Sequence, residues 1–162
     1  MGAEAAVGEQ DNMPENIRIR PGVKAIIWHQ GKVLFISEKL KNGEGEIVVY
    51  DVPGGGIEKN ESMMETLRRE VFEEVGLKIE VICPVGGWEL TLLKYNESIR
   101  AVCFAYFCKL SGSGQIDLSQ NPAQEDIFFA EWLTIDEALN RPNFITNADM
   151  RKTLENCRKL FE

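Results

Sequence analysis

The chain has 162 residues, of which 44% are hydrophobic and 27% charged, and its formal net charge at pH 7 is −8. This length and composition fit one globular domain whose core needs no disulfide staples. The acidic balance excludes a dedicated nucleic-acid-binding protein, which needs a basic face to neutralise phosphates. A phosphorylated small molecule stays compatible with it, because divalent cations can lie between phosphates and acidic side chains.

The amino-terminal segment 1–17 is small, polar and acidic, and Pro14 interrupts any helix within it. We interpret this segment as a disordered tail that precedes a single domain over residues 18–162. It lacks the apolar run of a secretory signal, and no stretch of the chain approaches the roughly 18 apolar residues of a membrane span. We therefore expect a cytoplasmic protein that does not bind membranes.

The cysteines give no sign of a metal site or of a disulfide framework. They are Cys83, Cys103, Cys108 and Cys157, none lies in a C-x-x-C pair, and the chain has a single histidine. A zinc site is therefore not predicted. We interpret the cysteines as reduced, partly buried thiols in a reducing compartment.

The first ordered elements are predicted to be strands. Two runs rich in β-branched and aromatic residues, Val23–His29 and Lys32–Ser37, flank a short glycine-containing link and predict a hairpin. The polar stretch Lys39–Glu46 predicts a loop. A short strand is expected over Ile47–Val52, and it ends at Pro53 and the three glycines that follow.

A helix is predicted over Met63–Val75, where apolar residues recur at spacings of three and four. Ser62 and Glu65 have the spacing of a capping box, which satisfies two backbone donors at a helix start. Gly76 is suited to the left-handed conformation that ends many helices.

The remaining chain alternates predicted strands and helices. Strands outnumber helices and the two kinds are interspersed, which indicates an α/β layered fold with a mixed β-sheet. Strands are predicted over Lys78–Val85, Trp88–Tyr95, Arg100–Leu110 and Ile127–Leu133, a short helix over Ile135–Leu139, and a longer one over Ala148–Phe161.

Three acidic residues of the predicted helix carry the chemical interest. Glu70, Glu73 and Glu74 stand at i, i+3 and i+4, so they share one face, and that face flanks the apolar stripe. Like charges so close destabilise a helix, and a hard divalent cation such as Mg²⁺ or Mn²⁺ would offset them. Such an ion also binds phosphate oxygens and activates water. Taken alone, the three glutamates are equally compatible with a solvated acidic helix face.

Neighbouring residues extend this cluster. The turn after Val52 is expected to bring glycine backbone close to the helix start, where a carbonyl oxygen can serve as a further metal ligand. Arg69 is expected to fix carboxylate rotamers through charge-assisted hydrogen bonds, and Glu61 to accept hydrogen bonds from that arginine or from loop amides.

The whole segment matches the pattern G-x5-E-x7-R-E-U-x-E-E-x-G-U, where U is a bulky apolar residue. Every specified position is filled, by Gly55, Glu61, Arg69, Glu70, Val71, Glu73, Glu74, Gly76 and Leu77. The segment therefore resembles the signature of the Nudix hydrolase (MutT-like) family, and we expect the likeness to extend over residues 18–161. The resemblance implies an α/β/α sandwich with a mixed β-sheet, and divalent-metal-dependent hydrolysis of a nucleoside diphosphate linked to a moiety X.

The resemblance also implies roles for residues of the segment. Glu70, Glu73 and Glu74 would be metal ligands together with the backbone carbonyl of Gly54, and the metal would be Mg²⁺ with Mn²⁺ as a substitute. Arg69 and Glu61 would support the constellation. Glu73 is favoured as the acid that orients or deprotonates the water.

Two further site residues are implied by the family pattern outside the signature. Asp126 stands six residues before Trp132, where family members often have a catalytic glutamate, and its neighbour Glu125 is an alternative. Tyr95 lies 18 residues beyond Leu77, a position typical of members that cleave dinucleoside polyphosphates. A solvated pair of loop acids and a tyrosine of the sheet remain the alternative interpretations.

Several functions stay open at this level. The substrate is expected to be a small nucleotide, with nucleoside triphosphates, dinucleoside polyphosphates and nucleotide sugars as alternatives. A catalytically silent nucleotide-binding sensor module is the competing interpretation. The sequence leaves the oligomeric state open, with a homodimer among the alternatives.

Overall fold

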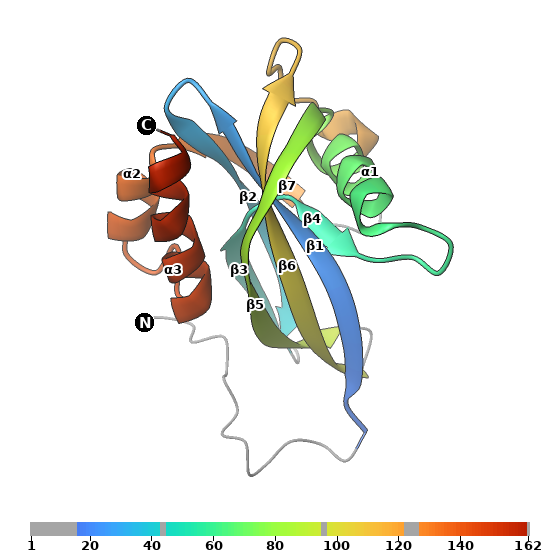
Figure 1. Ribbon diagram of the computed structural model, residues 1–162. Helices are drawn as coiled ribbons and strands as arrows, with labels where there is room; N and C mark the ends of the chain where they lie inside the picture. The colour runs from blue at the N-terminus through green and yellow to red at the C-terminus, as the bar shows by residue number, and fades with distance from the viewer. Residues whose placement is uncertain (1–15, 43–44, 95–96, 122–126, 162) are drawn as a thin grey trace.

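The structure of the chain is a computed structural model that describes residues 16–42, 45–94, 97–121 and 127–161. A mixed β-sheet lies between helix α1 (Met63–Val75) on one face and helices α2 (Ile135–Asn140) and α3 (Ala148–Cys157) on the other (Figure 1). This arrangement confirms the predicted α/β/α sandwich.

The sheet has seven strands, and one parallel pair lies at its centre. Strands β1 and β6 run parallel over eleven residue pairs, from Arg18 opposite Ile99 to Trp28 opposite Lys109, while the other strand pairs are antiparallel. The order is β3-β2-β1-β6-β5, with β4 paired to β1 and β7 paired to β2. The strands are β1 (Arg18–His29), β2 (Lys32–Asn42), β3 (Gly45–Asp51), β4 (Gly54–Gly56), β5 (Lys78–Lys94), β6 (Glu97–Ser111) and β7 (Ile127–Leu133).

Each face of the sheet carries its own hydrophobic core. Leu67, Val71 and Val75 of α1 pack on one face, and Met150 and Leu154 of α3 pack on the other, all of them fully or almost fully buried. Successive residues of a strand point to opposite faces, so β1 contributes side chains to both cores in alternation. The sheet is consequently covered on both sides, and α1 is held against it by burial of its apolar stripe.

The predicted limits of α1 are confirmed. The Ser62 hydroxyl accepts a hydrogen bond from the amide of Glu65 at 3.1 Å, and the Glu65 carboxylate accepts one from the amide of Ser62 at 2.8 Å. Gly76 ends the helix with φ of 70°, and its amide donates to the Phe72 carbonyl at 2.9 Å. Local capping chemistry therefore fixes both ends of the helix that carries the acidic residues.

Several other limits were predicted wrongly, among them the start of β1, which is Arg18 and not Val23. The segment Lys39–Glu46 is not a loop throughout, because β2 continues to Asn42 and β3 begins at Gly45. Since β3 lies at an edge of the sheet, polar side chains there can face solvent while the backbone still pairs. The two strands predicted between 78 and 95 are one strand, β5, whose pairing with β6 shifts between Val81 and Cys83 and again between Pro84 and Gly86. The last helix ends at Cys157, and a 3₁₀ turn follows it.

The four cysteines are free thiols, of which Cys83 is half-buried and the other three are buried. This confirms that they form no disulfides. In the part of the chain that the structure describes, no helix combines the length and the apolar character needed to cross a membrane.

Candidate active site

Helix α1 places Glu70, Glu73 and Glu74 in different environments. Glu70 and Glu74 are buried, with 5% and 3% of their surface exposed, and Glu73 is partly exposed. The interpretation of the three as a solvated acidic face is therefore wrong for Glu70 and Glu74. Buried carboxylates are costly unless a cation or hydrogen-bond donors compensate them, so the surroundings of each oxygen matter.

Arg69 is the centre of the ion-pair network around these residues. Its Nε and Nη2 donate to the two carboxylate oxygens of Glu61 at 2.6 and 3.0 Å, which is a bidentate pair. Its Nη1 donates to Glu70 Oε1 at 3.0 Å and to Glu73 Oε2 at 3.1 Å. The expected support of the carboxylates by Arg69 and Glu61 is thus present as geometry, and one guanidinium orients three acids.

Glu61 is held as an anion at the start of this network. Hydrogen bonds from Arg69, and then from the Thr66 hydroxyl at 2.8 Å, keep the pKa of Glu61 below its ordinary value. The same contacts raise the pKa of Arg69, because its hydrogen bonds to Glu61 outweigh the effect of burial. The pair therefore stays ionised across the physiological range.

Glu70 is the least compensated acid of the site. Its Oε1 accepts from Arg69, but its Oε2 is buried and has no hydrogen-bond partner among the described residues. Burial raises the pKa of Glu70, and the charge of Arg69 opposes this effect only in part. Gly55 lies directly against the carboxylate, since a Cβ at that position would come within 2.5 Å of Glu70 Cδ. Glycine at position 55 therefore makes room for the buried acid.

The glycine turn contacts the side chains of the second half of α1, and not the helix start as predicted. The amide of Gly54 donates to Glu74 Oε1 at 2.7 Å, which ties this buried carboxylate to strand β4. Gly54 has φ of 148°, and a Cβ there would collide with the carbonyl oxygen of Val23. Only glycine fits at this position, for both conformational and steric reasons.

A lysine next to the glycine turn was missed by the sequence reasoning. Lys24 of β1 pairs with Gly54, and its Nζ contacts Asp51 Oδ2 at 2.6 Å in a largely buried ion pair. Burial lowers the pKa of Lys24, but the charges of Asp51, Cys103 and Glu74 together raise it above its ordinary value. The sequence did contain a signal for this ion pair, namely a lysine between the buried residues of a strand. A buried charge is costly without a partner, so such a lysine indicates an acidic residue close to it.

The remaining candidate residues lie outside the segment of β4 and α1. Asp126 and Tyr95, together with Glu125, lie outside the described residues, so their roles stay predictions. Trp88 is buried in the core, and the ring of Trp28 stacks on Phe161 at 3.8 Å, so both side chains are engaged in packing.

The residues of the site suit a hard divalent cation in their chemistry. Among the residues that the structure describes, no three acidic, histidine or cysteine side chains form a ready-made metal cluster. Arg69 lies between the carboxylates of Glu70 and Glu73, while Glu74 is bound to the Gly54 amide. The buried Glu70 Oε2 nevertheless needs a partner, and an all-oxygen donor set is the one that Mg²⁺ and Mn²⁺ prefer. The carboxylate oxygens of the site therefore fit Mg²⁺ or Mn²⁺.

The layered fold and the sequence pattern carried by α1 point to one protein family. A model of the NUDIX domain family matches residues 18–157, and the chain belongs to the Nudix hydrolase family. A solved structure of similar fold is a MutT protein from Methanosarcina mazei Go1, with a TM-score of 0.66 and 20% identity, covering 92% of this chain and 99% of that one.

Two curated relatives extend this result. A MutT-like protein of Streptomyces ambofaciens is 30% identical over 116 residues, which cover 72% of this chain and 64% of the relative. Nudix hydrolase 2 of Arabidopsis thaliana is 26% identical over 147 residues, which cover 88% of this chain and 48% of the relative. The match thus spans about half to two thirds of these proteins.

Proposed function

We propose that this protein hydrolyses a phosphoanhydride bond in a nucleoside diphosphate linked to a further group X. The observation that carries the proposal is the buried, unpartnered Oε2 of Glu70, whose Oε1 is held by Arg69 beside Glu73 on a capped helix. The family to which the chain belongs supports the reaction type. The products would be a nucleotide and the phosphorylated X group.

Glu70, Glu73 and Glu74 would hold a divalent cation, with Mg²⁺ as the proposed ion and Mn²⁺ as a substitute. When bound, that cation supplies charge neutralisation of the phosphates and a more acidic water. Glu73, the most exposed of the three acids, would accept a proton from the attacking water and orient it toward phosphorus. Arg69 would keep Glu70 and Glu73 in fixed rotamers, so the donors need little reorganisation when substrate binds. The carbonyl of Gly54 and the side chain of Asp126 are proposed as further groups of the site.

We further propose that the protein works in the cytoplasm on small nucleotides rather than on nucleic acids or membranes. The net charge of −8 supports this, since only a metal-bridged polyphosphate would be attracted to an acidic site. Tyr95 is proposed as a contact to the nucleotide. A homodimer would be compatible with this function, and so would a monomer.

The proposal is tested with a substrate panel of nucleoside triphosphates, dinucleoside polyphosphates, ADP-ribose and nucleotide sugars. Each compound is incubated with Mg²⁺ and with Mn²⁺, and the products are identified by mass. We expect metal-dependent release of a phosphorylated product from at least one class. Metal-dependent nucleotide binding without turnover of any compound would instead support the sensor module.

The assignment of the acids is tested with Glu73→Gln and Glu74→Gln. Both changes keep the side-chain size while removing a charge, and we expect kcat to fall about 10²- to 10³-fold, the loss typical of a removed transition-state contact. Glu155→Gln, an exposed position on α3, is the matched control and should keep wild-type kcat. Full activity in both site variants, with unchanged thermal unfolding, would overturn the assignment.

A further inference from the structure

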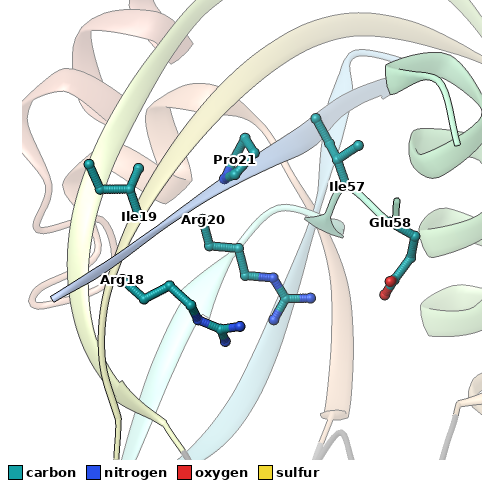
Figure 2. A pocket seen from close by; sticks show the side chains of 6 residues that line it. All are labelled: Arg18, Ile19, Arg20, Pro21, Ile57 and Glu58. Carbon is teal, nitrogen blue, oxygen red and sulfur yellow. The ribbon is translucent and has the colours of Figure 1, made fainter. Parts of the chain in front are cut away.

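A small cavity lies beside the glycine turn, at the start of β1. It has a volume of about 270 Å³ and is lined by Arg18, Ile19, Arg20, Pro21, Ile57 and Glu58 (Figure 2). The amide of Ile57 donates to the carbonyl of Pro21 at 3.1 Å, and Gly22 pairs with Gly56. The cavity therefore adjoins the strand, β4, whose other glycines contact Glu70 and Glu74.

Two arginines line the cavity although the protein is acidic. Arg18, Arg20 and Lys24 occupy alternate positions of β1, so they line one face of the strand in a row. Lys24 is engaged by Asp51, and Arg18 forms an exposed ion pair with Glu97 at 3.3 Å. The side chain of Arg20 forms no hydrogen bond and no ion pair with any other described residue. Its guanidinium therefore has donors to offer to a ligand.

The side chain of Arg20 is positioned by packing, and not by an ion pair with an acidic residue. The side chain is half-buried, and a Cβ on Gly56 would overlap its guanidinium, so the arginine lies directly against the backbone of β4. In Figure 2 the guanidinium groups of Arg18 and Arg20 extend to the same side of the strand. The two guanidinium groups thus face one region beside Gly56.

We propose that Arg20, together with Arg18, binds a phosphate of the substrate that lies beyond the hydrolysed bond, so that the X group is itself anionic. The proposal rests on the proposed function and narrows its substrate class to compounds with three or more linked phosphates. A guanidinium offers planar paired donors that match phosphate oxygens. The cavity has room for a phosphate group.

Glu58 opposes this role at the edge of the cavity. It is exposed, and its carboxylate lies at the cavity that Arg20 lines, so it repels an anion bound there. Its removal should therefore strengthen phosphate binding, which is an effect of opposite sign to the removal of Arg20. A merely structural role for the two residues would not produce opposite signs.

The first experiment measures binding of inorganic tripolyphosphate by calorimetry at a fixed free Mg²⁺ concentration. We expect Arg20→Gln to raise Kd about 10- to 100-fold, as for a lost hydrogen bond to a charged group, and Arg20→Lys to restore part of the affinity. Glu58→Gln should lower Kd about twofold. Arg141→Gln, whose arginine pairs with Glu131 elsewhere, is the control and should bind like the wild type. A wild type that binds no tripolyphosphate, or an Arg20→Gln variant within twofold of it, would overturn the proposal.

The second experiment compares kcat/KM for a nucleoside triphosphate or dinucleoside tetraphosphate with that for a nucleotide sugar, whose X group carries no extra phosphate. We expect Arg20→Gln to lower kcat/KM for the polyphosphates about 10-fold or more through KM, relative to the nucleotide sugar. Equal losses on both classes would refute the phosphate site and leave the proposed function standing. If the wild type hydrolyses nothing but binds tripolyphosphate through Arg20, the phosphate site stands and the proposed function fails.

Discussion

Gly55 offers a direct test of how tightly the buried acid is packed. Gly55→Ala would place a Cβ 2.5 Å from both Cδ and Oε1 of Glu70. Ordinary contacts begin near 3.4 Å, so the carboxylate must move by about 0.9 Å, the difference between the two distances. The bond from Arg69 Nη1 to Glu70 Oε1, now 3.0 Å, would then exceed hydrogen-bonding distance.

The expected magnitude follows from that displacement. Overpacking costs about 1–3 kcal/mol, and losing a hydrogen bond to a charged group costs about 1.5–3 kcal/mol. Both values describe the same displacement of the Glu70 carboxylate, so they are not added. We therefore expect Gly55→Ala to lower the free energy of unfolding by about 2 kcal/mol and Tm by about 4–8 °C. Displacement of a site group by nearly 1 Å should also lower kcat about 10²-fold.

A double-mutant cycle with Glu70→Ala isolates the contact. In the Glu70→Ala background the added methyl group has no carboxylate to displace, so the cost of Gly55→Ala in urea unfolding should fall below about 0.5 kcal/mol. The coupling energy between the two positions would then exceed about 1 kcal/mol. If Gly55→Ala costs the same in both backgrounds, or leaves both stability and kcat unchanged, the reasoning about the Glu70 environment is refuted.

Two further predictions concern ionisation. Because hydrogen bonds from Arg69 hold the pKa of Glu61 below its ordinary 4.5, their contribution to stability is present above that pH and is lost as the pH falls through the lower folded pKa. Urea unfolding should thus show a steeper acid loss of stability in the wild type than in Glu61→Gln, and parallel profiles would contradict the ion pair. Burial raises the pKa of Cys108 and of Cys157 to about 12, so alkylation at pH 8 should begin at the half-buried Cys83. A fast-reacting thiol that persists in Cys83→Ser would count against this order.

Elements defined by neighbouring residues could be predicted from the sequence alone. Ser62 and Gly76 determine the two ends of α1 because capping involves atoms within a few residues of each other. The spacing of Glu61, Arg69 and the helical glutamates indicated the family for the same reason, since one helix and the residues next to it carry most of the pattern. The limits of β2 and β3 were missed, because a polar edge strand looks like a loop until its partner is known.

Burial and pairing across the sheet were decided only by the tertiary structure. Spacing put Glu70, Glu73 and Glu74 on one helix face, but the packing of β4 against α1 determines that Glu70 and Glu74 are buried and that Glu73 is not. The same packing brings the Gly54 amide to Glu74, 20 positions away in the chain, and Arg20 to Gly56. Such contacts depend on which strands become neighbours, and this is set by the burial of both cores together rather than by any local pattern.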